Sequence, residues 1–271
     1  MMKILKKSTA VGLIMVFCLI LSQPAKAEVV SKWYNNYQYY ALNSDSVMVC
    51  GYRGNGKQIT VPSEIKGKKV TGVSGMKKAS KVKTIILPKY ASSCELSEAP
   101  ALTAIKVVSG NPYLTVQKNC VIKDHTTLLT YPGGLRKLDD MPSCIIKIGN
   151  AFSNSNIETV VFSKNVRRLG VSAFNGCTKL KSVKLNTQLR YIGNHAFEGC
   201  TSLREIKLGK NVLTIEPSAF ENSGLKKIVI KNPSCYIASY AIPSKAVIYG
   251  YKNSTAQEYA RANGNVFVAL D

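Results

Sequence analysis

Between residues 145 and 230 the apolar residues recur in one fixed pattern. The pair Ala-Phe appears four times, at intervals of 22, 23 and 23 residues. The copies are Ala151-Phe152, Ala173-Phe174, Ala196-Phe197 and Ala219-Phe220. Each pair is followed by a run of the form apolar-x-x-apolar-x-apolar, written IETVVF, LKSVKL, LREIKL and LKKIVI. The end of each run alternates with a period of two, which predicts a short strand with one buried face.

A single strand of this kind cannot bury its apolar face alone, but stacked copies share a continuous core. A period near 22 residues matches one coil of a solenoid. An apolar residue also precedes each Ala-Phe pair and is usually followed by Gly, as in Ile148-Gly149 and Ile192-Gly193, whereas the last copy has Ile215-Glu216. The sequence therefore predicts a β-rich solenoid.

The unit IGNHAFEGCTSLREIKL resembles the BspA-like leucine-rich repeat of bacterial secreted and surface proteins. Five features keep their spacing across two perfect and two slightly altered copies, and similar pieces extend the likeness over roughly residues 45–271. The resemblance implies a leucine-rich-repeat-type right-handed superhelix with coils of ~22–23 residues. It also implies adhesion or ligand binding.

We place the solenoid at residues 57–250. The pattern predicts a cap at each of its ends. Residues 28–56 contain an aromatic hairpin around a turn at residues 43–46, which would cover the first coil. These aromatic residues could instead stack on sugar rings. Residues 107–134 break the rhythm as an irregular hairpin insertion, which could form a lip beside a binding face. In residues 251–271 a capping box at residues 254–257 predicts a helix followed by a strand.

The first 27 residues read as a signal peptide cleaved after Ala27. Three lysines precede an uncharged run at residues 8–21, and Ala25-Lys26-Ala27 supplies small residues for cleavage. Lipidation at Cys18 is the alternative, but Phe17 stands where such sites have a small residue. We expect a secreted or cell-surface protein without a transmembrane segment after cleavage.

The chain is strongly basic, with a formal net charge of +22. Cleavage would remove four lysines and no acid, leaving +18. Such an excess attracts anionic partners. Export argues against cytoplasmic nucleic acid and leaves an extracellular protein or an anionic polymer, such as a glycan, a wall polymer or extracellular DNA.

Basic residues gather at the x positions of three consecutive runs, which are expected to face outward on the strand-lined concave side. The predicted ligand-binding residues are Lys181, Lys184, Arg204, Lys207, Lys226 and Lys227. They would form columns in which Lys181 lies over Arg204 and Lys226. The same rule places Val229 outward. Glu205 lies within the columns and weakens the case, and a solvated basic face without a ligand is the alternative.

No catalytic constellation is found in the sequence. His125 and His195 are the only histidines, and His195 takes the repeat position that Ser172 and Ser218 occupy in neighbouring coils. The adjacent pair Asp139-Asp140 would point in opposite directions. We predict no enzyme, no cofactor and no metal site.

Seven cysteines would remain after cleavage, an odd number that excludes a complete disulfide framework within one chain. Cys177 and Cys200 share one repeat position, where other copies have Ser155 and Ser223. A position that accepts Cys or Ser favours buried thiols, with a disulfide between the two as the open alternative.

Together these observations predict an exported, non-catalytic repeat protein that binds a partner through its strand-lined face. The alternative is a structural or assembly module of the cell surface without a small ligand.

Overall fold

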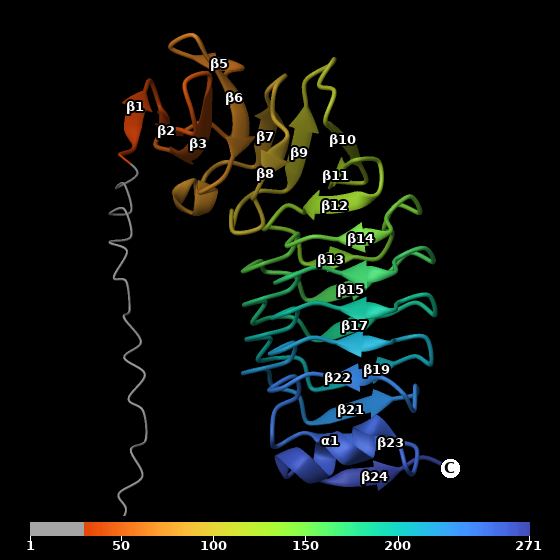
Figure 1. The fold of residues 1–271 in the computed structure, drawn as a ribbon. Helices are drawn as coiled ribbons and strands as arrows, with labels where there is room; N and C mark the ends of the chain where they lie inside the picture. Colours follow the sequence, from red (N-terminus) through yellow and green to blue (C-terminus); the bar gives the residue numbers. More distant parts are fainter. Residues whose placement is uncertain (1–29) are drawn as a thin grey trace, which may run out of the picture. The chain divides into compact units, whose positions relative to one another are not determined.

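The computed structural model describes residues 30–271, so the predicted signal peptide lies outside the described residues. Residues Ser31–Asp271 form one compact unit. The chain winds as a β-solenoid of about 10 turns with ~22 residues per coil and one C-terminal helix (Figure 1). This confirms the predicted fold class.

The closing run of each coil forms a strand, as predicted, and the strands of successive coils are parallel. They are β13 (Lys137–Leu138), β15 (Thr159–Val161), β17 (Ser182–Lys184), β19 (Glu205–Leu208), β21 (Lys227–Ile230) and β23 (Val247–Gly250). We call the outward side of this row the strand face. Its strands belong to two ladders, because β17 ends one sheet and β19 begins the next. The pairing is therefore interrupted in the middle of the row.

A second row of very short strands, which the sequence analysis did not predict, lies elsewhere on the coil. These strands are β14 (Lys147–Ile148), β16 (Arg168–Leu169), β18 (Tyr191–Ile192), β20 (Thr214–Ile215) and β22 (Tyr236–Ile237). They form the parallel part of an eight-stranded sheet. The first four begin one residue before the buried apolar residue of the motif that precedes Ala-Phe, and in β22 the corresponding Ile237 is half-buried. Two residues are too few to reveal a strand period, so only stacking makes these strands visible.

The predicted insertion supplies the start of the eight-stranded sheet. Its strands β10 (Leu114–Gln117), β11 (Cys120–Lys123) and β12 (Thr127–Thr130) are antiparallel, and β12 then pairs in parallel with β14. β11 buries Cys120 and Ile122 in the C-terminal core and Val121 in the N-terminal core. The insertion thus contributes buried side chains to both hydrophobic cores and connects them.

The N-terminal part begins with an antiparallel hairpin of β2 and β3. In its turn the Asn43 side-chain oxygen accepts hydrogen bonds from the backbone N–H groups of Asp45 and Ser46, both at 2.9 Å. The elements of this part are β1 (Lys32–Tyr34), β2 (Tyr37–Ala41), β3 (Ser46–Tyr52), β4 (Gln58–Thr60), β5 (Glu64–Ile65), β6 (Lys68–Val73), a 3-10 helix (Met76–Lys78), β7 (Thr84–Leu87), β8 (Ser93–Cys94) and β9 (Ala104–Val107). From β3 onward the chain joins the solenoid through the parallel pairing of β3 with β6.

The repeat phenylalanines form the centre of the C-terminal core. Phe152, Phe174, Phe197 and Phe220 are fully buried and their rings stack nearly parallel, with centroids 4.7, 5.1 and 5.1 Å apart. The equal repeat spacing places the same ring at the same height in each coil. The four-fold Ala-Phe pattern is therefore a continuous aromatic column inside the solenoid.

Asparagine side chains tie the turns of neighbouring coils together at the bend between the two rows. Asn232 donates to the backbone carbonyl of Val212 at 2.8 Å, and Asn186 donates to that of Val166 at 3.0 Å. Asn265 donates to three carbonyls between Pro243 and Ala246. These bonds satisfy backbone groups that the tight turn leaves without strand partners.

The C-terminal cap consists of α1 (Thr255–Asn263) and β24 (Phe267–Ala269). The Ser254 side chain accepts a hydrogen bond from the backbone N–H of Gln257, and Gly264 adopts the left-handed conformation after the last turn. β24 pairs with β23 and lies at the end of its sheet. The predicted helix-strand cap is confirmed.

Candidate interaction surface

The six predicted binding residues all lie on the strand face, but they form two groups. Lys184 is the last residue of β17 and Lys181 directly precedes this strand, which lies at the end of one ladder. Arg204, Lys207, Lys226 and Lys227 lie on or beside β19 and β21. Within the second group Lys226 donates its backbone N–H to Arg204 at 2.8 Å, so these two occupy neighbouring rungs. Five of the six predicted residues are exposed, and Lys227 is half-buried.

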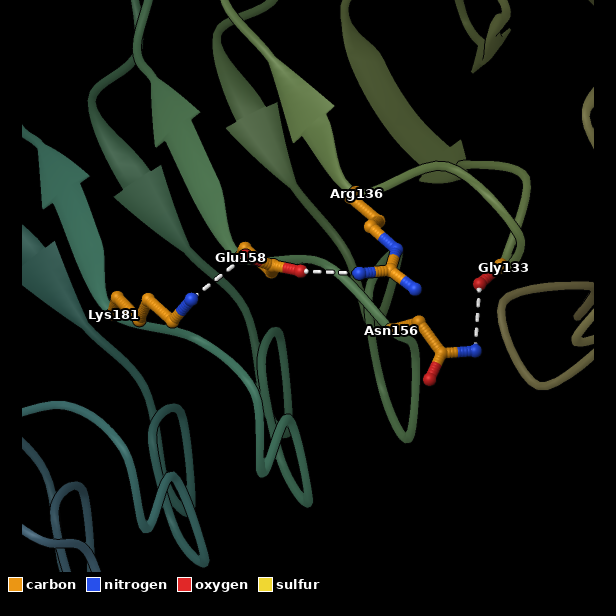
Figure 2. Close-up of polar contacts among 5 residues, drawn as sticks. All are labelled: Gly133, Arg136, Asn156, Glu158 and Lys181. Atoms are coloured by element: carbon orange, nitrogen blue, oxygen red, sulfur yellow. Dashed lines mark hydrogen bonds and ion pairs between the residues drawn. The ribbon is translucent and has the colours of Figure 1, made fainter.

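Glutamates neutralise part of this basic face. Figure 2 shows Glu158 between two cations, with one carboxylate oxygen 3.0 Å from Arg136 Nη1 and the other 2.9 Å from Lys181 Nζ. The hydrogen bond from Lys181, with a further contribution from Arg136, holds the pKa of Glu158 below its usual value. Lys181 therefore already has an anionic partner within the protein.

Glu205 has a similar role on the next ladder. Its Oε1 atom lies 3.4 Å from Lys207 Nζ and 3.6 Å from Lys227 Nζ. Arg204 donates from Nη1 to the backbone carbonyl of Gly224 at 3.0 Å. Among the described residues, Lys184, Arg204 and Lys226 are the members of the predicted set that take part in no ion pair.

Val229 was predicted to face outward, but only 7% of this residue is exposed to solvent. Its partners in register are Lys207 and Tyr249, whose longer side chains stand on either side of it. A short apolar side chain between two long ones loses its access to solvent.

The segment before the second strand row was not predicted as a site. Arg167, Arg168 and Arg190 are exposed on β16 or next to β16 and β18, and Arg168 lies over the Tyr191 ring at 4.2 Å from its centroid. The sequence does show two basic or aromatic residues before the buried apolar residue in two successive coils, RRL at residues 167–169 and RYI at residues 190–192. Because no strand was predicted there, the sequence did not show on which side of the coil these residues lie.

His195 occupies a turn position that requires a left-handed backbone. Its φ is 56°, and the equivalent residues Ser172, Ser218 and Tyr240 have φ values of 57°, 56° and 56°. Nδ1 of His195 lies 2.9 Å from a carboxylate oxygen of Glu198. Serine, histidine and tyrosine thus fill the same turn position in four coils, so the backbone conformation there is set by the repeat.

A cleft of about 880 Å³ borders the predicted site at its C-terminal end. It lies where the coil is shortened: five residues, 242–246, connect Ala241 to β23, whereas eight residues, 174–181, connect Ala173 to β17. Its lining includes Lys226, Lys245 and, from α1, Tyr259. Lys226 therefore lies at the border between the strand face and this cleft.

The cysteines of the described chain are free thiols, and Cys177 and Cys200 are fully buried. Each donates to a carbonyl of the preceding coil, Cys177 to Phe152 at 2.9 Å and Cys200 to Phe174 at 3.1 Å. Burial raises the pKa of Cys177 to about 11 and that of Cys200 still further. The interpretation as buried thiols agrees with this geometry.

We expect alkaline pH to destabilise the fold through these thiols. A Cys177 thiol ionises near pH 9.0 when unfolded and near 11 when folded. Its contribution to stability is therefore complete below pH 9 and is lost as the pH rises from 9 to 11. Two pKa units correspond to about 3 kcal/mol. Urea unfolding between pH 8 and 11 should show a shallower pH dependence in Cys177→Ser, and identical profiles would contradict the assignment.

Among residues 30–271, no cluster of three or more His, Cys, Asp or Glu side chains could hold a metal ion. In the same part of the chain, no helix has the length and hydrophobicity needed to cross a bilayer.

Stacked coils of about 22 residues, each closed by a parallel strand, define a leucine-rich repeat solenoid. Residues 139–248 match the model for the BspA type leucine-rich repeat region in six copies. This part of the chain therefore consists of BspA-type leucine-rich repeats, and the resemblance inferred from the repeat unit is confirmed.

Two bacterial proteins with solved structures are similar to this chain. The pneumococcal vaccine antigen PcpA is 14% identical, with a TM-score of 0.52 over 90% of this chain and 99% of that chain. A leucine rich cell surface protein from Faecalibacterium prausnitzii A2-165 is also 14% identical, with a TM-score of 0.49 over 87% of this chain and 98% of that chain. At this identity the likeness to PcpA shows the fold alone. Among curated proteins, none matches the chain.

Proposed function

We propose that this chain is an exported, non-catalytic repeat protein that holds an anionic partner, in the first place a glycan or wall polymer, against its strand face. Export is supported by the signal-like pattern of residues 1–27. The repeats support a binding role, because stacked coils provide an extended surface. Residues 139–248, the BspA-type repeats, include all six predicted binding residues.

The observation that carries the proposal is the set of cations on the strand face that lack an internal partner. Lys184, Arg204 and Lys226 lie on three consecutive coils and take part in no ion pair among the described residues. Lys181, Lys207 and Lys227 extend the site, but a ligand must compete there with Glu158 and Glu205. These exposed ion pairs are weak, so an incoming anion can replace them.

A variant that combines Lys184→Ala, Arg204→Ala and Lys226→Ala tests the proposal with heparin as the probe. We expect affinity at physiological salt to fall about ten-fold, and the dependence of affinity on salt to become shallower, because fewer counterions are exchanged. Surface plasmon resonance over a salt series measures both effects. The matched control removes three positive charges elsewhere, with Arg167→Ala, Arg168→Ala and Arg190→Ala. Equal losses in the two variants would show that heparin senses only the overall charge.

An assembly module is the second candidate function. β24 ends its sheet, and the nearby Val266 and Val268 are 63% and 37% exposed. A strand edge with exposed apolar side chains can pair with another chain. Oligomers that grow with protein concentration in light scattering would favour this function over polymer binding.

A further inference from the structure

The second strand row carries a compact group of basic residues on three consecutive coils. We define the arginine face as Lys147, Arg167, Arg168, Arg190 and Tyr191. Lys147 is paired in register with Arg168, which is paired with Tyr191. One residue earlier, Arg190 donates its backbone N–H to Arg167 at 2.9 Å. All four basic residues are exposed.

The alternation along each short strand fixes the direction of these side chains. Ile148, Leu169 and Ile192 are fully buried in the core. Because neighbouring residues of a strand point to opposite sides, Lys147, Arg168 and Tyr191 point outward. The buried repeat residue therefore orients these three side chains. Arg167 and Arg190 precede β16 and β18, and both are exposed at the start of those strands.

The arginine face differs from the strand face in its lack of internal neutralisation. None of its four cations takes part in an ion pair with another described residue, whereas Glu158 and Glu205 engage three of the six basic residues on the strand face. Glu216 lies beside Tyr191, where it adds to burial in raising the tyrosine's pKa. The guanidinium groups are thus free to meet an external anion.

Tyr191 orders one of these guanidinium groups. Arg168 lies over its ring with 4.2 Å between the guanidinium carbon and the ring centroid. A guanidinium stacked by its flat face keeps its N–H groups directed outward at its edge. Such an edge matches the two oxygens of a carboxylate in a forked pair of hydrogen bonds.

Exposed apolar residues flank the arginines along the stack. Ile146 and Leu213 are 40% and 53% exposed, and successive backbone bonds of 2.8, 2.9 and 2.8 Å connect Ile146, Arg167, Arg190 and Leu213 in one column. At a rung spacing of about 4.8 Å, this column is about 14 Å long. Arginine and tyrosine with apolar neighbours are the residue types enriched at protein–protein hot spots.

We propose that the arginine face is a second binding site, which takes an acidic polypeptide segment whose carboxylates are flanked by apolar side chains. Forked hydrogen bonds from the arginines bind the carboxylates, and Ile146 and Leu213 contact the apolar side chains. A sulfated or phosphorylated polymer offers oxyanions but has nothing to place on the apolar ends. The site is separate from the strand face, so it stands or falls independently of the proposed glycan binding.

A stability measurement distinguishes this role from a structural one. The arginines repel each other and have no ion pair to lose, so the one contact removed, between Arg168 and the Tyr191 ring, is offset by the relief of repulsion. The variant with Arg167→Ala, Arg168→Ala and Arg190→Ala is therefore expected to keep the melting temperature of the parent. A clear drop in melting temperature would show that the arginines stabilise the fold, and this would overturn the proposal.

The binding test uses three probes: a random copolymer of glutamate and tyrosine, polyglutamate, and heparin. At physiological salt we expect the copolymer to bind more tightly than polyglutamate. The triple arginine variant should lose about ten-fold or more of the copolymer affinity, whereas the triple variant of Lys184, Arg204 and Lys226, which removes the same charge, should stay within about three-fold. Ile146→Ser with Leu213→Ser should weaken copolymer binding and leave polyglutamate binding unchanged.

Two outcomes would overturn the proposal. Equal loss of copolymer affinity in the two triple variants would mean that charge alone is sensed. Heparin binding that depends on the arginines, with neither polypeptide bound, would make the occupant a glycan. Failure of the strand-face proposal is read separately, from heparin and the strand-face variant.

Discussion

Replacing Phe174 with alanine is expected to lower the free energy of unfolding by about 3 to 5 kcal/mol. Phe174 is fully buried in the middle of the aromatic column, between Phe152 at 4.7 Å and Phe197 at 5.1 Å. Phe162 adds a third ring at 6.4 Å. Removing the central ring leaves a cavity and breaks two stacked pairs, each of which contributes beyond its buried area.

The damage should also spread along the solenoid. Each coil contacts only its neighbours, so stability depends on the interfaces between adjacent coils. Phe174 takes part in two such interfaces, one with the coil of Phe152 and one with that of Phe197. We therefore expect a broader unfolding transition as well as a lower midpoint.

Urea denaturation followed by circular dichroism measures both effects. Val171→Ala is the matched control, because this valine lies on the same coil and is 60% exposed. The control should change the unfolding free energy by less than about 0.5 kcal/mol. A loss below about 1 kcal/mol for Phe174→Ala would show that the aromatic column is not the main support of the core.

Gly133→Ala is expected to cost about 3 kcal/mol by forcing the two cores apart. A Cβ atom at Gly133 would collide with the backbone carbonyl of Ser97 and lie 2.9 Å from that of Ala99. Both are backbone atoms, so no flexible side chain can move away. The neighbouring Gly134 donates its N–H to the Leu102 carbonyl at 2.8 Å, which fixes this close approach.

The site of the change determines how the protein should unfold. The chain segment around Gly133 lies against the N-terminal core, whose residues run from Tyr39 to Val121, while the following coils build the other core. Weakening this contact should separate one cooperative transition into two. Calorimetry would detect two peaks in Gly133→Ala and one in the parent. Gly209→Ala is the control, because a Cβ atom there meets nothing within 4 Å. A single unshifted peak for Gly133→Ala would contradict the tight contact.

Several parts of the candidate surface followed from the sequence and others did not. The outward direction of Lys184 and Lys207 could be read from the strand period, since one buried residue fixes the direction of its neighbours. Their ion pairs could not, because Glu158 meets Arg136 and Lys181 only across coils 22 and 23 residues apart. The arginine face was missed for a related reason, since strands of two residues leave no period to detect.

The sequence by itself determined the features that each coil repeats: the coil length, the closing strand, the buried phenylalanine, the small thiol position, and the cap signalled by Ser254 and Gly264. A repeated pattern states many times which side chains are buried, so it is readable without coordinates. Only the tertiary structure decided what neighbouring coils do to each other. The break between β17 and β19, the neutralisation of half the basic strand face, the free arginines and the contact of Gly133 depend on distances between coils, which local patterns do not encode.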